Sequence, residues 1–344
     1  SDNDELSRRL DTYLNRSVKS QESDRWKKQE VALNKKREED RNKKEEFHTG
    51  WKNYFKENLE RDRAIINKNP GSITESIHYL FNQAHELKGS INRWTQYNWK
   101  RLVQEYGEEV AHFYRDATVS FWRNYKPDLR SEGKVSNQTP FSVKIGLTGL
   151  EIEANETEDW LSVLNPLEVE LACRYASYEL NGFPVWLPLL FQIHQDFVSK
   201  FLLQEIKYEL SVTTFKKDIN YIIHDLSWSG QWAWNRIAPE ILKLVKNEPK
   251  NIFILDKLLI IIQGSSLTNE LIEKIASRKC HTLKKHNHLV RWYAVWTGVA
   301  PEPAINSLQE YINNIRDTKI QTRFAMLYVT NLLGDHRTEE VQVR

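Results

Sequence analysis

Two stretches decide the fold: LACRYASYELNGFPVW at residues 171–186 and LVRWYAVWTGVAP at residues 289–301. Each is apolar and aromatic at helical spacing, breaks at a glycine that a proline follows closely, and resumes as a second apolar segment. Paired segments of this kind are typical of proteins built from stacked helical repeats. We therefore predict an all-α fold, an elongated HEAT- or armadillo-like array of antiparallel helix pairs.

The pattern continues through the repeat array, which we place at residues 141–334. Glycine or proline separates most of the apolar segments, and no alternating β-branched run is long enough for a sheet. We predict helices near 166–181, 184–194, 196–211, 216–226, 232–246, 251–263, 268–280, 286–297, 301–314 and 319–333. The core of the array should contain Leu171, Tyr175, Tyr178, Trp186, Leu190, Phe201, Trp232, Leu258, Trp292, Trp296, Leu308 and Phe324.

The first 69 residues have a different composition. Basic and acidic residues are interleaved, and only four apolar residues lie between Lys19 and Glu46. Strong helix formers dominate, and opposite charges recur three and four residues apart, as in a solvated helix. We predict a long charged helical arm or linker over residues 1–69. A coiled coil or a nucleic-acid-binding arm is the alternative, and the missing heptads in the middle weigh against the coiled coil.

A break at Asn69-Pro70-Gly71-Ser72 ends the arm. We predict an aromatic-rich helical subdomain over residues 70–140, with helices over 73–88 and 91–124 and Gly107 as the point where the second would divide. A polar loop closes it. Residues 141–153 are expected to form a short helix or an extended connection to the array, and residues 335–344 a polar tail.

Aromatic and basic residues alternate over residues 92–126. Such a mixture can stack on bases and bind phosphate, or it can be a set of core rings whose cations reach solvent. The second arrangement is the commoner one on helices, and nucleic-acid binding through this face is the alternative function that we keep. The candidate binding residues are Arg93, Trp94, Tyr97, Trp99, Lys100, Arg101, Trp122 and Arg123.

No catalytic motif accompanies these patterns. The only Gly-Lys pair, Gly133-Lys134, lacks the upstream glycine of a phosphate-binding loop. The Cys280–His288 stretch contains four potential zinc ligands, but their spacing matches no standard finger and three lysines surround them. A metal-dependent enzyme at that stretch is therefore the third reading. We expect this chain to have no catalytic residue, no bound metal and no cofactor.

The composition also indicates the cellular compartment in which we expect the protein. The two cysteines, Cys173 and Cys280, lie in predicted helices far apart in the sequence, which fits a reducing compartment better than a disulfide framework. No apolar run approaches 18 residues and no secretory signal is present, so we expect a cytoplasmic protein with no membrane span. The formal net charge of +2 is too small to steer the whole chain toward nucleic acid. The opening at Ser1 suggests a piece of a longer protein.

Three segments carry a resemblance to a known family: GLTGLEIEA at residues 146–154, the stretch at 171–186, and VRWYAVWTGVAPEPA at 290–304. Over roughly residues 140–330 the chain resembles the helical-repeat part of large bacterial NACHT/STAND-type NTPases, several of which are linked to anti-phage defence. In those proteins an ATPase drives assembly and a long helical array senses a target.

The resemblance implies that this chain is a non-catalytic recognition and assembly module, the sensor or scaffold part of a larger defence-type NTPase. Its partners would be another protein or adjacent domains of the same protein. The nucleotide site of the family has no counterpart here, because the chain contains no Walker motif that could receive it.

Overall fold

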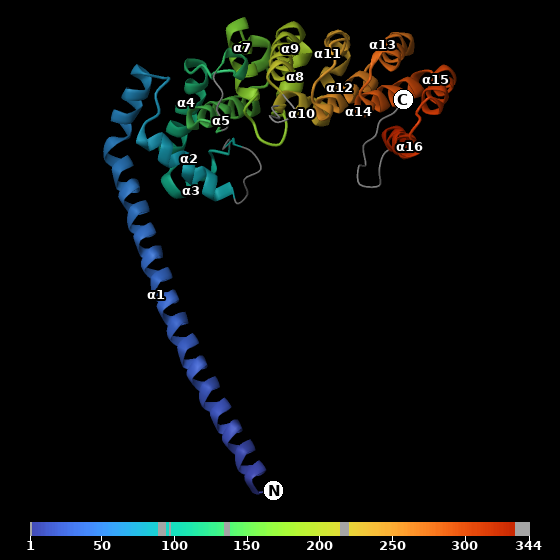
Figure 1. Ribbon diagram of the computed structural model, residues 1–344. Helices are drawn as coiled ribbons and strands as arrows, with labels where there is room; N and C mark the ends of the chain where they lie inside the picture. Colours follow the sequence, from blue (N-terminus) through green and yellow to red (C-terminus); the bar gives the residue numbers. More distant parts are fainter. Residues whose placement is uncertain (1, 89–93, 96–97, 134–137, 214–219, 334–344) are drawn as a thin grey trace. The chain divides into compact units, whose positions relative to one another are not determined.

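A computed structural model describes residues 2–88, 94–95, 98–133, 138–213 and 220–333, shown as a ribbon in Figure 1. All regular structure within these residues is helical, and none of them lies in a strand. The predicted all-α fold is confirmed. The chain forms two compact units, Ser1–Ala64 and Ile65–Arg344.

Helix α1 (Asp2–Lys68) makes up the first unit and continues into the second. Side chains described between residues 3 and 46 are all exposed, and ion pairs such as Arg9 with Glu5, four residues apart at 3.1 Å, lie along this stretch. Nearer the end of α1, Phe55 and Leu59 are buried. The solvated part of the helix therefore ends well before its last residue.

The second unit contains helices α2–α16 and one short 3-10 helix, η1. The first of them are α2 Glu75–Lys88, α3 Arg101–Tyr106, α4 Glu108–Asn124, η1 Arg130–Glu132, α5 Phe141–Glu156, α6 Trp160–Val163, α7 Pro166–Ala176 and α8 Leu187–Ile193. The remainder are α9 Gln195–Val212, α10 Tyr221–Ser229, α11 Gln231–Leu244, α12 Ile252–Gly264, α13 Asn269–Thr282, α14 His286–Val299, α15 Pro301–Asn313 and α16 Thr318–Leu333.

Helices begin and end near the glycine and asparagine residues that interrupt the apolar segments of the sequence. Gly107 separates α3 from α4 with a φ of 87°, a conformation that glycine adopts without steric cost. Asn165 caps α7, with its side chain accepting hydrogen bonds from the amides of Leu167 and Glu168. The predicted helix over 166–181 ends early, at Ala176, because the chain turns through Asn181 and Gly182, both with positive φ.

Helices of the second unit pack mainly on helices close to them in the sequence. Contacts link α4 to α5, α5 to α7, α7 to α9, and α9 to α10 and α11. They continue from α11 to α12, from α12 to α14, and from α14 to α13, α15 and α16, a succession that can be followed in Figure 1. Such nearest-neighbour packing is what a helical-repeat array requires.

Helix α5 takes the place of the short helix or extended connection predicted for residues 141–153. Residues 145–152 are all buried. A Cβ on Gly149 would overlap the carbonyl oxygen of Thr118 in α4, and one on Gly146 would overlap the ring of Tyr175 in α7. The two glycines lower the helix propensity of the segment but allow this close approach, so burial stabilises the helix. The expected division at residue 140 consequently lies inside one compact unit.

Most side chains predicted for the core are buried. The buried ones are Tyr175, Trp186, Leu190, Phe201, Leu258, Trp292, Trp296, Leu308 and Phe324. Leu171, Tyr178 and Trp232 are partly buried and pack against the same core. The core therefore runs through the junctions between successive helices, as the two aromatic stretches predict.

Truncating either of two tryptophans should destabilise the protein strongly. Trp186 is 2% exposed and Trp296 is 4% exposed, so Trp186→Ala and Trp296→Ala each leave a cavity between rigid helices. We expect each change to lower the free energy of unfolding by about 3–5 kcal/mol in chemical denaturation. The matched control is Val185→Ala, at an exposed neighbouring position, with an expected change below about 0.5 kcal/mol. Losses under about 1 kcal/mol in both tryptophan variants would contradict the core assignment.

Deleting the exposed part of α1 should leave the second unit folded. Residues 1–46 contribute no described buried side chain, so their removal should shift the thermal midpoint by no more than a few degrees. A longer deletion, of residues 1–63, removes all but the last residue of the first compact unit and should likewise leave the second unit folded, with its midpoint within a few degrees. Differential scanning calorimetry of the two truncated chains measures both shifts. Loss of cooperative unfolding in the shorter deletion would show that the exposed stretch supports the fold.

Candidate functional site

The aromatic–basic residues predicted as a binding face are divided among three places. Trp99 and Lys100 precede α3, which begins at Arg101. Trp122 and Arg123 lie in the last turn of α4. Trp94 lies in the segment before α3, and two further predicted residues, Arg93 and Tyr97, are outside the described part of the chain.

Two of the predicted rings are buried and hydrogen-bonded to carboxylates of α5. The indole Nε1 of Trp122 donates to Glu153 at 2.8 Å, and that of Trp99 donates to Glu156 at 2.6 Å. The Trp122 side chain has no exposed surface, and Trp99 is also buried. Neither ring has a free face on which a base could stack, so both belong to the packing of α4 and α5.

The cations beside these rings are neutralised by acidic residues. The guanidinium of Arg123 donates to both oxygens of Glu153, at 2.7 and 2.8 Å, and to Glu168 of α7 at 2.6 Å. Arg115 pairs with Glu156 at 2.7 Å. This part of the predicted face is therefore a salt-bridged helix junction, and Lys100 and Arg101 are its exposed cations.

Trp94 instead lines a pocket with a volume of about 500 Å³. The lining comes from six segments: the stretch before α3, η1, the stretch before α5, α5 itself, the turn after α7, and α10. Its charged and aromatic members are Trp94, Arg130, Lys144, Tyr178, Glu179, Tyr221 and Asp225. Residues more than a hundred positions apart in the sequence thus meet in one concave site.

Each cation of this pocket lies against an aromatic ring. The ammonium nitrogen of Lys144 is 3.6 Å from the centre of the Trp94 ring, and the guanidinium carbon of Arg130 is 3.4 Å from the centre of the Tyr221 ring. Cation–π contacts of this length hold a charge in place without neutralising it. Burial lowers the pKa of Lys144 from its ordinary value.

The two acidic residues of the pocket differ in what they bind. Glu179 is buried, and one of its oxygens accepts hydrogen bonds from the backbone amides of Trp94 and Leu180, both at 2.8 Å. It therefore fixes two segments of the pocket wall. Burial raises the pKa of Asp225 to about 6, with an opposing effect from Lys257, so its carboxylate is mostly ionised at neutral pH.

A buried carboxylate on α9 supports the wall that α10 forms. The oxygens of Glu209 accept hydrogen bonds from the amides of Ile222 and Ile223, at 2.9 and 3.0 Å, at the start of α10. These amides have no partner inside their own helix. Burial raises the pKa of Glu209 to about 7 despite the two hydrogen bonds, which lower it. Sequence reasoning missed this cap because the acid precedes the helix by more than ten residues.

The potential zinc ligands of the Cys280–His288 stretch are engaged elsewhere. His288 contacts Glu248 at 2.9 Å, and the ammonium of Lys279 donates to the same carboxylate at 2.6 Å. Cys280 is buried, and burial raises the pKa of its thiol. Among the described residues there is no group of three or more potential metal ligands. The structure therefore offers no support for the hypothesis of a metal-dependent enzyme at this stretch.

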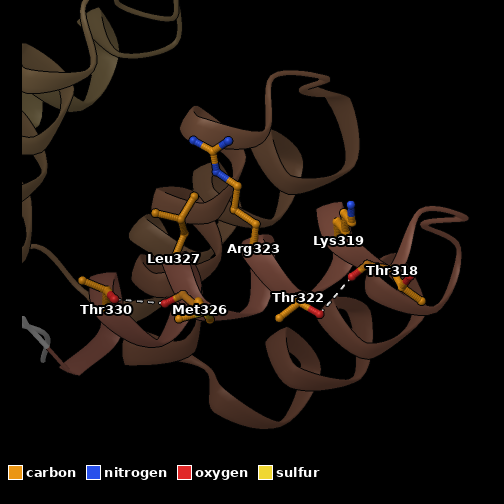
Figure 2. A pocket seen from close by; sticks show the side chains of 7 residues that line it. All are labelled: Thr318, Lys319, Thr322, Arg323, Met326, Leu327 and Thr330. Carbon is orange, nitrogen blue, oxygen red and sulfur yellow. Dashed lines mark hydrogen bonds between the residues drawn. The ribbon is translucent and has the colours of Figure 1, made fainter.

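A shallow hollow with a volume of about 640 Å³ lies along α16, shown in Figure 2. All of its lining residues come from one face of this helix. The hydroxyls of Thr322 and Thr330 donate to carbonyl oxygens four residues earlier, those of Thr318 and Met326. Because these hydroxyls bond to the backbone, the face is more apolar than its threonine content indicates.

Another exposed apolar surface lies on α8. Leu189 and Ile193 of α8 are 50% and 52% exposed, and Val185, which lies two residues before the helix begins, is 64% exposed. Helix α8 contains no charged residue and packs against α6, α7, α9 and α11. Two further exposed apolar side chains, Val163 and Leu167, lie at the end of α6 and the start of α7. We call Val185, Leu189 and Ile193 the α8 stripe.

Comparison of the chain with protein-family models, with curated proteins and with solved structures gives no match. Within the described residues, no helix combines the length and the apolar composition needed to cross a membrane. The pocket and the α8 stripe are therefore the structural features that bear on the function of this chain.

The stability of the protein should fall as the pH rises through the titration of Glu209. The folded state holds this proton more tightly than the unfolded state, whose pKa is near 4.5. The free energy of unfolding therefore decreases between about pH 4.5 and pH 7, by at most about 3 kcal/mol from this group. Glu209→Gln removes the titration and should flatten that part of the profile.

Urea denaturation of both proteins at pH 5 and pH 7.5 measures the difference between the two profiles. The control is Glu302→Gln, at an exposed position, which should keep the slope of the unchanged protein. Equal slopes for the Glu209→Gln variant and the unchanged protein would show that the burial of Glu209 does not raise its pKa.

Proposed function

We propose that this chain is a non-catalytic recognition and assembly module. It acts in the cytoplasm as the helical sensor or scaffold part of a larger NTPase of the NACHT/STAND type that its repeat segments resemble. The observation that carries the proposal is the α8 stripe, three exposed apolar side chains in and just before a helix with no charged residue.

The composition of the stripe favours a protein partner over a nucleic acid. Binding to a phosphate backbone depends on basic side chains, and α8 has none. An apolar row gains free energy when another apolar surface covers it, and no charged group of α8 has to be stripped of water in the process. The partner is therefore an apolar protein surface, either of a second protein or of an adjacent domain.

The packing of the second unit supports the same proposal. Successive helices contact mainly their neighbours in the sequence, which leaves several helices, α8 among them, with exposed apolar side chains. Helical arrays present such side chains on extended surfaces for partners. The rings that could have formed a base-stacking face, Trp99 and Trp122, are instead buried with carboxylate partners.

Site-specific photo-crosslinking tests the proposal. A photoreactive residue at position 189 should form a crosslink to one defined protein segment in cells that make the natural protein. The double change Leu189→Asp and Ile193→Asp should weaken the same complex at least tenfold, because charge in a desolvated interface is costly. Its thermal midpoint should shift by no more than a few degrees, since about half of each side chain is exposed.

The matched control is Gln192, which is exposed on the same helix but outside the α8 stripe. Gln192→Asp introduces a charge there and should leave the complex intact. Absence of a reproducible crosslink at position 189, or equal binding by the double variant, would refute the α8 stripe as the recognition surface.

A further inference from the structure

We propose that the pocket lined by Trp94, Arg130, Lys144, Tyr221 and Asp225 binds a small organic phosphate, with Arg130 and Lys144 holding the phosphate group. The inference is separate from the protein-recognition role, since α8 contributes nothing to the pocket lining. It starts from two cations that share one concave site and form no salt bridge in the described part of the chain.

Arg130 is the first of these cations. Among the described residues it forms no ion pair, and its buried Nη1 has no hydrogen-bond partner. Burial raises the pKa of Glu205 and of Glu209, and the charge of Arg130 acts in the opposite direction on both, so these carboxylates are the acidic groups that it influences. A guanidinium can donate five hydrogen bonds, and an unmade bond from a buried charged group is costly. The ring of Tyr221 lies against its planar face at 3.4 Å, so this ring does not occupy the edge that carries the donors. That edge matches the oxygens of a phosphate.

Lys144 is the second cation. It projects from α5 and contacts the Trp94 ring at 3.6 Å, and within the described ranges it forms no hydrogen bond or ion pair to an acidic residue. Partial burial without a counter-ion disfavours its charged form. An anion bound in the pocket would remove that penalty, so the site gains free energy from a ligand of opposite charge.

Other arginines of the same region form salt bridges, in contrast to Arg130. Arg115, Arg123 and Arg174 each pair with at least one carboxylate at 3.0 Å or less. Arg174 is buried, and its partners include Glu132, only two residues after Arg130. Glu132, one of the two acidic residues nearest in sequence to Arg130, is thus engaged by another arginine.

The acidic residues of the pocket indicate which hydrogen-bond donors the ligand carries besides its phosphate group. Glu179 is occupied by the backbone amides of Trp94 and Leu180. Asp225 lines the same pocket. In the described part of the chain, its carboxylate accepts no hydrogen bond. It would accept a hydrogen bond from a hydroxyl or amino group of the ligand. A sugar or nucleoside monophosphate carries such groups next to its phosphate.

The size of the pocket fits a ligand of this class. Its volume of about 500 Å³ lies within the range of roughly 300–1,000 Å³ that is usual for small-molecule sites. The rings of Trp94, Tyr178 and Tyr221 supply apolar and aromatic surface. A phosphate alone would leave most of that surface uncovered, so an organic phosphate is the better match.

Isothermal titration calorimetry of the full chain with AMP, inorganic phosphate and adenosine tests the proposal. AMP should bind saturably, phosphate should compete with it more weakly, and adenosine should bind at least tenfold more weakly than AMP. Arg130→Gln and Lys144→Gln should each weaken AMP at least tenfold, because each removes one of the two cations. Raising the salt concentration should weaken AMP binding to the unchanged protein.

Lys100→Gln is the matched control, since it removes an exposed cation beside Trp99, outside the pocket. Circular dichroism checks that each variant is folded. If Arg130→Gln unfolds because it loses the contact with Tyr221, Lys144→Gln and Asp225→Asn decide the matter. No saturable binding of AMP or phosphate at millimolar concentration would overturn the proposal. So would equal binding of AMP by the pocket variants, or adenosine binding as tightly as AMP.

Discussion

The close approach of α5 to α4 and α7 is the contact on which the rest of this region depends. It requires glycine at two positions, because any side chain at Gly149 would meet the backbone of α4 and any side chain at Gly146 would meet the ring of Tyr175. Once α5 is seated, its carboxylates reach the indole nitrogens of Trp99 and Trp122. The same helix carries Lys144 into the wall of the pocket. The close packing of α5 on α4 and α7 thus positions both a salt-bridged junction and a candidate ligand site.

Several buried tryptophans share one structural use in this chain. Buried indoles tie helices together through Nε1: Trp292 donates to Glu248, and Trp234 donates to the carbonyl oxygen of Leu226. A large ring fills the gap between helices while its one polar atom finds a partner across the junction. Trp94 departs from this use, since its ring supports a cation in an open pocket.

The sequence predicted the helices well and the site poorly, for physical reasons. Glycine and proline punctuation is a local signal, so the helix expected at 286–297 corresponds to α14 and the one at 301–314 to α15. The helix α5 was underestimated because its two glycines lower propensity and its stability comes from burial, which propensity does not report. Local patterns also could not tell packed rings from binding rings. The carboxylates that engage Trp99 and Trp122 lie 57 and 31 residues away in the sequence.

The pocket has a physical consequence for a structure built on nearest-neighbour packing. In the second unit each helix contacts mainly helices close to it in the sequence, so segments far apart in the sequence make few direct contacts with one another. The pocket is an exception, since Trp94 and Tyr221 line it together. A ligand that contacts both walls stabilises only the arrangement in which they face each other, by an amount that grows with ligand concentration.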